Sequence, residues 1–515
     1  MIKCDRIYVA FPRSEIIKNT RRISRMEDNK LQAGTTKEDT ISIKKVLLTI
    51  LFFTPLVLGT IGYYSAFEKS NFLHAFYCAI SLYVLNLGSD ATNVLIHIAR
   101  FGAALATSAV VLNRFSKIIK RIAAVLIPLS SLDVTVVYTD SDKYDYLDRE
   151  KGCIVSKDKI FIHCPAQILM FDDFDNLDFY EKNRHDFELV NRTTYMLMED
   201  IDPYMLKNSN IRYFSINDTI ARKFWMENNL CDFMDKKTGE VNCKIAIIGF
   251  SQLGKHIFRQ AILNNIYSLN QRIEYHVWGD NGLFESQHDD WNAILMNNDS
   301  CIFEGEQTED LCKLKDIDRI IITDEKMISL AQMIMSAYPE KAVYFYSSRK
   351  RNLEERLVGN LHEFGDIREV VTLDNIKSDK LYKAANKLNE DYNINNPDNA
   401  CSWENLDGFT KGSNIAPADY HAIRLAINKK RNDYKLENYS NDIDGEGPKL
   451  EHIRWCRYHY LNNWKYGEPD DKNKSKDRTK KIHKYLQPYD KLDKEIQQND
   501  VDNILTLYRI FETKG

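Results

Sequence analysis

The stretch from Lys244 to Asn265 reads KIAII, GFSQLG and KHIFRQAILNN, and it decides the fold. Its opening run is apolar and β-branched, which is typical of a buried strand. A turn with glycine at both ends follows, from Gly249 to Gly254, and the rest of the stretch fits a helix. A strand, a glycine-containing turn and a helix in this order predict a βαβ unit of a parallel sheet.

The turn matches GxGxxG, the fingerprint of Rossmann-type dinucleotide-binding folds, except that Ser251 replaces the middle glycine. Gly249 permits the tight turn, and Gly254 permits close packing of helix on strand. Asp280 follows the next predicted strand, Arg272–Trp278, where an acidic side chain can bind a ribose hydroxyl. These four residues are the candidates for nucleotide binding. Since Ser251 adds a Cβ where a pyrophosphate would approach, a purely structural turn stays the alternative.

Short apolar runs on both sides of this stretch predict further strands. The earlier runs are Asp133–Tyr138, Lys159–Cys164, Thr193–Met198 and Ile211–Phe214, and the later ones are Ser300–Phe303, Arg319–Thr323 and Ala342–Tyr346. The segment INDTIARKFWMENN predicts a helix capped by Asn217 or Asp218. We therefore expect two Rossmann-like units, over 129–238 and 239–390. No glycine-rich turn opens the first unit, so its dinucleotide site is expected to be degenerate.

Apolar residues are concentrated near the N-terminus. Val46–Phe67 carries no charge, and Val94–Leu112 is interrupted only by His97 and Arg100. Because about 20 apolar residues cross a bilayer, both stretches are predicted to span a membrane. Phe72–Gly88 is shorter and fits a re-entrant segment.

Basic residues flank both stretches on their outer sides, which predicts two crossings of the inner membrane with both termini in the cytoplasm. The pore module is expected over 46–128, after a cytoplasmic segment over 1–45. A signal peptide followed by a buried helix is the alternative for the apolar region. It is disfavoured because many polar residues precede Val46.

The segments AFYCAISLYVLNLGSD and ATNVLIHIAR resemble the pore of two-helix potassium channels. The resemblance places Asn86, Leu87, Gly88, Ser89 and Asp90 at the filter, with Arg100 opening the inner helix. Ser89 and Asp90 depart from the family pattern of Tyr and Gly. The resemblance implies a homotetramer in the lipid bilayer that conducts monovalent cations with weakened potassium selectivity, and a ring of Asp90 side chains would attract cations. A non-conducting anchor is the alternative.

A pore followed by two Rossmann-like units is similar to channels with regulatory RCK domains, over roughly 46–380. The C-terminal stretch that begins EHIRWCRYHYLNNWKYGEPDD resembles the RyR domain, a small helical repeat. This second resemblance implies a sensor domain over 391–515 without a defined activity. Basic and aromatic residues there suit phosphates and bases. The ligand candidates are Arg454, Trp455, Trp464, Arg478, Lys480, Lys481 and His483.

Composition limits the remaining functions. The net charge of −4 excludes a chain that is basic as a whole, and ten scattered cysteines without a CxxC pair exclude a zinc finger. No P-loop, HExxH or GxSxG motif is present, so we expect no enzyme and no metal.

The expected fold is multidomain, with a two-helix transmembrane pore module, α/β Rossmann-like domains and a small, mainly α C-terminal domain. The expected function is a cation channel gated by a nucleotide-type ligand, either NAD, another adenine nucleotide or an oligonucleotide. It would act in homeostasis or in defence against phage. A membrane-anchored nucleotide sensor that does not conduct is the main alternative, and a membrane-bound NAD-dependent enzyme is a weaker one.

Overall fold

The structure is a computed structural model of the 515-residue chain. It describes residues 43–67, 71–84, 89–108, 134–157, 160, 164–188, 192–206, 211–235, 237–288, 290–305, 310–397, 400–430, 442–471 and 474–512. The predicted filter residues Asn86, Leu87 and Gly88, and most of the strand predicted at Lys159–Cys164, lie outside these residues. The chain divides into two compact units, Met1–Lys120 and Arg121–Gly515.

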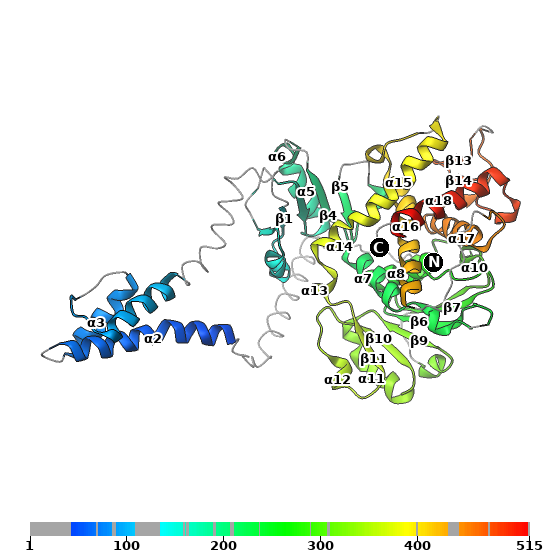
Figure 1. Ribbon diagram of the computed structural model, residues 1–515. Helices are drawn as coiled ribbons and strands as arrows, with labels where there is room; N and C mark the ends of the chain where they lie inside the picture. Colours follow the sequence, from blue (N-terminus) through cyan, green and yellow to red (C-terminus); the bar gives the residue numbers. More distant parts are fainter. Residues whose placement is uncertain are drawn as a thin grey trace, which may run out of the picture. The chain divides into compact units, whose positions relative to one another are not determined.

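The first unit contains helices that lie side by side (Figure 1). These are α2 (Ile43–Ala66), α3 (Phe72–Ser81), the 3₁₀ turn η1 (Leu82–Val84) and a helix over 94–108. A Cβ added at Gly59 would lie 3.1 Å from the Cβ of Ala79, so glycine lets α2 and α3 approach closely. Asn93 joins α2 to the helix over 94–108, because its side chain donates to the Gly62 carbonyl at 2.8 Å and accepts from the Ile96 amide at 2.8 Å.

The membrane predictions are not borne out by this unit. Within the described residues, no helix is both long enough and apolar enough to cross a membrane. This finding corrects the predictions of two crossings, of a pore module over 46–128 and of an inner-membrane location. Ser89 and Asp90 are described, half-buried and exposed respectively, and are no longer assigned to a filter.

The second unit begins with a five-stranded parallel sheet in the order β2-β1-β3-β4-β5. Its strands are β1 (Thr135–Tyr138), β2 (Cys153–Ser156), β3 (Ala166–Leu169), β4 (Thr193–Leu197) and β5 (Ile211–Phe214). Its helices are η3 (Asp142–Arg149), α5 (Asp173–Lys182), α6 (Arg184–Glu188), η4 (Pro203–Met205), α7 (Ile216–Glu227) and η5 (Leu230–Phe233). This order is the flavodoxin-like order of doubly wound α/β folds.

A six-stranded parallel sheet follows, in the order β11-β10-β9-β6-β7-β8. Its strands are β6 (Asn242–Ile248), β7 (Arg272–Trp278), β8 (Ser300–Gly305), β9 (Arg319–Ile322), β10 (Ala342–Tyr346) and β11 (Leu361–Phe364). The intervening helices are α8 (Gln252–Asn264), α9 (Gly282–Glu285), α10 (Trp291–Leu295), η6 (Leu311–Leu314), η7 (Glu325–Met327), α11 (Ile328–Ala337) and α12 (Leu353–Arg356). Counted within the sheet, the order is 3-2-1-4-5-6 from β8, which is the Rossmann order.

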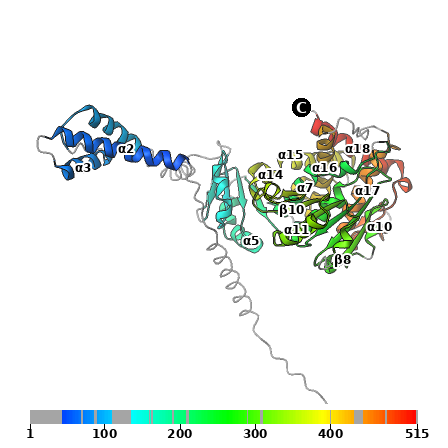
Figure 2. The same cartoon turned by 90° about the horizontal axis from the view of Figure 1, so that it is seen from below.

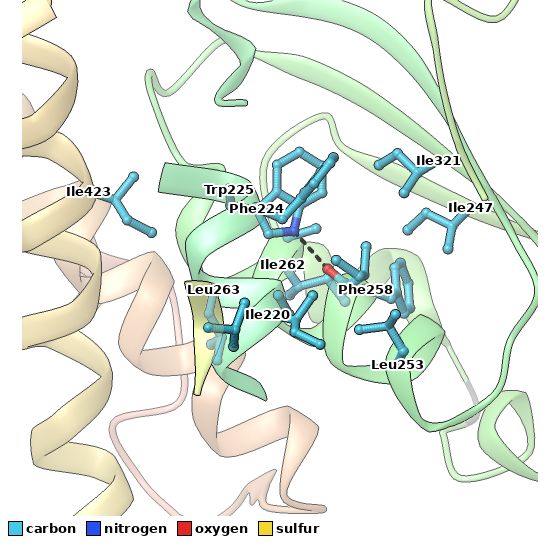
Figure 3. Packing of buried hydrophobic residues seen from close by; sticks show 14 of the residues in the cluster. Ile220, Phe224, Trp225, Ile247, Leu253, Phe258, Ile262, Leu263, Ile321 and Ile423 are labelled. Carbon is cyan, nitrogen blue, oxygen red and sulfur yellow. Dashed lines mark hydrogen bonds between the residues drawn. The ribbon is translucent and has the colours of Figure 1, made fainter. Parts of the chain in front are cut away.

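Alternating side chains of the central strands bury both faces of this sheet. Ile245 and Ile247 of β6 pack toward α7 and α8, and Ala246 and Ile248 pack with residues of α11. Figure 3 shows the first of these layers, in which the Trp225 indole of α7 donates to the Ile257 carbonyl of α8 at 2.8 Å. Figure 2 shows α7 and α11 on opposite sides of β10. The Rossmann-like α/β part of the predicted fold class is therefore confirmed.

The C-terminal segment adds helices and a small sheet to the second unit. Its helices are α13 (Ile367–Val370), α14 (Leu373–Lys377), α15 (Asp379–Asn395), η9 (Trp403–Asn405), α16 (Gly408–Lys430), α17 (Glu446–Leu461), η10 (Tyr489–Lys491) and α18 (Lys494–Glu512), and its strands are β12 (Lys465–Tyr466), β13 (Lys476–Asp477) and β14 (Ile482–His483). Arg457 of α17 forms a fully buried ion pair with Asp299 at 2.7 Å, just before β8. Its guanidinium also donates to the carbonyls of Ile262 and Leu295. These contacts join α17 to the second sheet.

Candidate functional site

The GxSxxG turn closes on itself at the end of β6. Gly249 has φ +94°, and a Cβ at Gly254 would lie 2.3 Å from the Gly249 carbonyl oxygen. The Thr323 hydroxyl, from the end of β9, donates to the same carbonyl. Ser251 is exposed and occupies the N-cap of α8, where its side chain makes no capping hydrogen bond. The two glycines therefore have the predicted structural roles, for the turn and for close packing.

The edge of the turn toward β7 is also crowded. A Cβ at Gly279 would lie 2.3 Å from the Phe250 amide nitrogen, and Phe250 is buried against Phe258 and Phe284. Asp280 is exposed at the end of β7. The four predicted nucleotide-binding residues thus lie around one turn, but none of them lines the cavity described next.

A cavity of about 830 Å³ lies beside α8 in the second unit. This volume falls within the range of about 300–1,000 Å³ typical of small-molecule sites. Its walls come from the ends of β4 and β5, from α7 and α8, from the start of α15 and of α16, and from the residues that follow α17. Residues far apart in the sequence therefore meet at one site.

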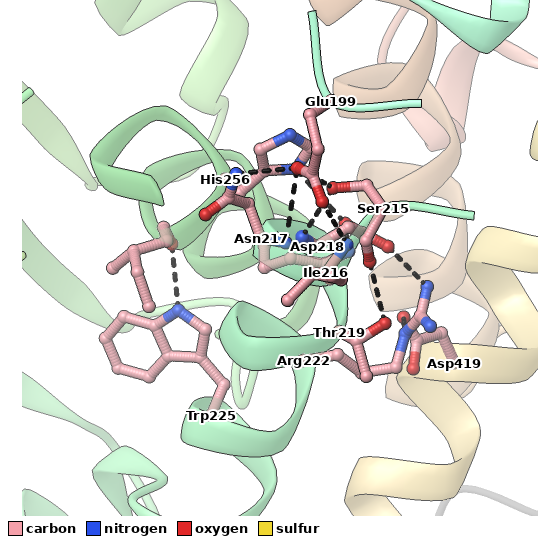
Figure 4. A network of polar contacts seen from close by, with 12 residues as sticks. Glu199, Ser215, Ile216, Asn217, Asp218, Thr219, Arg222, Trp225, His256 and Asp419 are labelled. Carbon is pink, nitrogen blue, oxygen red and sulfur yellow. Dashed lines mark hydrogen bonds and ion pairs between the residues drawn. The ribbon is translucent and has the colours of Figure 1, made fainter. Parts of the chain in front are cut away.

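The start of α7 forms an acidic part of the wall. The Glu199 carboxylate, after β4, accepts hydrogen bonds from the Ser215 hydroxyl at 2.9 Å, the Ile216 amide at 2.5 Å and the Asn217 side chain at 2.6 Å (Figure 4). Burial raises the pKa of Glu199 above its ordinary value, although these hydrogen bonds oppose the shift. An anion at a helix N-terminus is stabilised by the free amide groups there. Glu199 is thus a carboxylate of the protein itself that accepts hydrogen bonds from donors at the N-terminus of α7.

Ser215 also corrects the predicted cap of α7. Its side chain accepts from the Asp218 amide at 3.0 Å, so it is the N-cap, whereas Asn217 and Asp218 lie inside the first turn. Any of the three residue types can cap a helix, so their order in the sequence did not identify the cap.

Arg222 of α7 binds two carboxylates of the wall. Its Nε lies 2.5 Å from Asp419 of α16, and its terminal nitrogen lies 2.8 Å from Asp218 (Figure 4). Burial raises the pKa of Asp218, but Arg222, His256 and Gln260 outweigh it and hold that pKa well below its ordinary value. Burial raises the pKa of Asp419 above its ordinary value, against the effect of Arg222. The network joins α7, α8 and α16 across the cavity wall.

One face of α8 supplies cations to the cavity. Gln252, Lys255, His256 and Arg259 line it, at positions that share a helix face. Gln252 donates to Asp200 at 3.1 Å, and His256 lies 3.5 Å from Asp218. In the part of the chain that the structure describes, neither the Lys255 ammonium nor the Arg259 guanidinium has a hydrogen-bond or ion-pair partner, although both residues are half-buried. This face leaves two positive charges available to a ligand.

Aromatic side chains form other parts of the wall. Tyr382 and Trp403 lie edge to face, with ring centroids 6.3 Å apart, and the Arg212 guanidinium lies 4.9 Å from the Tyr382 ring centroid. Phe409 stacks on Trp464 at 5.1 Å. All five residues line the cavity. Such surfaces can accommodate a planar heteroaromatic ring.

The C-terminal ligand candidates separate into two groups. Trp464, Arg478 and Lys481 line the cavity. Arg478 pairs with Asp407, and Lys481 donates to the Asn462 carbonyl at 3.2 Å. These three residues reach the site because the segment after α17 folds back toward the start of α16.

The other four candidates lie outside the cavity wall. Arg454 is buried against Glu451 at 2.7 Å, and Lys480 is exposed and pairs with Asp470. Trp455 and His483 pack edge to face, with ring centroids 5.0 Å apart. Burial lowers the pKa of His483 to about 3, and its ring accepts from the Tyr485 amide at 3.2 Å, so it packs as a neutral residue.

A Cys–His–Asp arrangement lies within the C-terminal helices. The Cys456 sulfur lies 3.4 Å from His452 Nε2, and Asp500 lies 3.3 Å from His452 Nδ1. All three residues are buried and none lines the cavity, so no substrate reaches the sulfur in this arrangement. Among the described residues, no cluster of three or more His, Cys, Asp or Glu side chains is suited to hold a metal ion.

No protein-family model, no curated protein and no solved structure matches the chain. Together with the lack of a membrane-spanning helix among the described residues, this corrects the resemblances drawn from short motifs. The two-helix potassium-channel pore, the RCK architecture and the RyR domain are not supported. The parallel sheets remain as the confirmed part of that interpretation.

Sequence patterns missed most of the cavity wall. Lys255 and Arg259 had a local signal, because they lie four residues apart on the helix that follows the GxSxxG turn. Arg222 and Asp419 had none, since 197 residues separate them. Glu199 is likewise recognisable only once β4 and α7 are placed together.

Proposed function

We propose that the second unit is a receptor for a nucleotide-type ligand, bound in the cavity beside α8. The observation that carries the proposal is the pair of cations on the cavity wall, Lys255 and Arg259, for which the described residues provide no acidic partner. A phosphate group would supply the missing negative charge. Arginine in particular binds phosphate oxygens in a bidentate manner.

The other charges of the wall favour this reading because most of them are already paired. Asp218 and Asp419 share Arg222, and Asp407 pairs with Arg478. Glu199 is held by the start of α7. Because these carboxylates already pair with cations or hydrogen-bond donors of the protein, they repel an anionic ligand less strongly than their number suggests.

The aromatic residues support a ligand with a base. Tyr382, Trp403, Phe409 and Trp464 line the same cavity as the two cations. Stacking of a base on an aromatic side chain contributes about 1–3 kcal/mol. One part of the wall suits phosphates and another suits a base, and a nucleotide contains both groups.

Binding fits this cavity better than catalysis. The Cys456–His452–Asp500 arrangement is buried away from the cavity. Gly249, Ser251 and Gly254 of the GxSxxG turn, which a dinucleotide-dependent oxidoreductase would use, do not line it either. Walls drawn from the first sheet, from α8 beside the second sheet and from the C-terminal helices suit a sensor, because a ligand that contacts all of them favours one arrangement of these elements.

Isothermal titration calorimetry of the full chain with ATP, NAD and a cyclic dinucleotide tests the proposal. We expect at least one of them to bind, and Lys255→Ala or Arg259→Ala to weaken that binding about tenfold or more. The estimate follows from about 1.5–3 kcal/mol for a hydrogen bond to a charged group. Inorganic phosphate alone should bind more weakly, because it lacks the base.

Two matched substitutions serve as controls. Lys350→Ala and Arg356→Ala remove the same side chains from exposed positions outside the cavity wall. They should leave the affinity unchanged. The proposal is wrong if none of the three nucleotides binds, or if the control substitutions weaken binding as much as those on α8.

A further inference from the structure

A relay of side-chain amides runs along α8 beside the cavity. Gln260 Nε2 donates to Asp218 Oδ1 at 2.7 Å, and Asn264 Nδ2 donates to Gln260 Oε1 at 2.5 Å. All three residues line the cavity. Asn264 ends the relay with only 2% of its surface exposed.

The orientation of both amides follows from the carboxylate at the start of the relay. An ionised carboxylate only accepts hydrogen bonds, so Gln260 must present its NH₂ group to Asp218. Arg222, bound at 2.8 Å, keeps Asp218 in the ionised form. Gln260 then presents its oxygen to Asn264, which must donate in turn. The Asn264 oxygen is thereby left as an acceptor.

That acceptor is unsatisfied. Among the described residues, Asn264 Oδ1 is buried without a hydrogen-bond partner. A buried polar atom in this state is unfavourable, and native structures rarely leave one without a reason. A donor brought by a ligand would remove the penalty.

Apolar residues of the same cavity wall surround this end of α8. Leu263, Tyr458 and Leu461 belong to one buried cluster, and Phe409 packs against it. All four line the cavity. A flat ring with one hydrogen-bond donor suits such surroundings, whereas a phosphate does not.

We propose that Asn264 selects the base of the ligand by accepting a hydrogen bond from its exocyclic amino group. The cavity then takes an amino-bearing base such as adenine in preference to the 6-oxo analogue, hypoxanthine. This inference rests on the proposed nucleotide-binding function and names the specificity of the same site.

Two pairs of nucleotides test it on the unmodified full chain. ATP is compared with ITP, and NAD with its hypoxanthine analogue, by calorimetric titration. Within each pair the 6-amino group changes to a carbonyl oxygen, which would face the Asn264 oxygen, and the adjacent ring N1 changes from an acceptor to an N–H donor. We expect the hypoxanthine form to bind about tenfold more weakly or worse, because an acceptor would be left unpaired.

A substitution assigns the preference to this side chain. Asn264→Leu keeps the approximate volume and removes the acceptor, so the two members of each pair should bind within about twofold of each other. Asn360→Leu is the control, since Asn360 is exposed and lies outside the cavity wall. It should retain the full preference for adenine.

The outcomes separate this inference from the proposed function. Equal binding of both members of each pair by the unmodified chain would overturn the role of Asn264, yet the receptor would stand if Arg259→Ala still weakened both. Binding of none of the four nucleotides would overturn this inference, and it would overturn the proposed function as well if the cyclic dinucleotide also failed to bind. Loss of folding in Asn264→Leu, monitored by circular dichroism, leaves the comparison on the unmodified chain to decide.

Discussion

Arg222 illustrates how single residues shape this cavity. It neutralises Asp218 and Asp419, which come from α7 and α16, and Asp218 in turn orients Gln260 and Asn264. One guanidinium thus neutralises two carboxylates of the wall and, through Asp218, fixes which way the two side-chain amides point. A buried ion pair is weak evidence for stability but strong evidence that removing one partner is harmful.

Replacing Arg222 with alanine should therefore destabilise the second unit. We expect Arg222→Ala to lower the free energy of unfolding by about 3 kcal/mol, since two carboxylates lose their counterion. The value lies at the low end for a broken buried pair because 20% of the side chain is exposed. Urea unfolding followed by circular dichroism measures the change.

Arg184→Ala provides the comparison for this measurement. The ion pair between Arg184 and Glu181 is exposed and 3.7 Å long. Removing it should therefore lower the free energy of unfolding by less than about 1 kcal/mol. Equal losses in the two variants would show that the Arg222 network has no special importance.

Helices and strands were the features that the sequence predicted best. The runs at Arg272–Trp278 and Ala342–Tyr346 are strands with those bounds, and α8 follows the GxSxxG turn as expected. These elements have local causes, namely apolar β-branched runs and glycines with defined backbone roles. The turn itself was predicted correctly. The sequence did not predict that the cavity lies along α8, the helix that follows the turn.

The turn gives a prediction at the scale of an element. We expect Gly254→Ala to destabilise the second unit by about 1–3 kcal/mol or more, because its Cβ would lie 2.3 Å from the Gly249 carbonyl oxygen. Gly282→Ala is the control, as nothing lies within 4 Å of a Cβ added there. Thermal unfolding of both variants decides. If Gly254→Ala unfolds at the same temperature as the unmodified protein, the space around Gly254 is larger than the structure shows.

For the whole molecule, the sequence indicated two parallel sheets without indicating how their elements meet. Strand order, the return of the C-terminal segment toward α16 and the Arg457–Asp299 pair depend on contacts between residues far apart in the chain. Short motifs near the N-terminus and C-terminus instead suggested a channel and a sensor domain that no comparison supports. The expected homotetramer rested on the same resemblance and stays a prediction.

A ligand-bound structure of the full chain is the most direct test of the central claim, that the cavity beside α8 binds a nucleotide. The best-binding of ATP, NAD and the cyclic dinucleotide would be used. We predict density within the walls formed by α7, α8 and α16, with phosphate oxygens within hydrogen-bond distance of Lys255 and Arg259. Density at the Gly249 turn with an empty cavity, or no bound nucleotide at all, would contradict the claim.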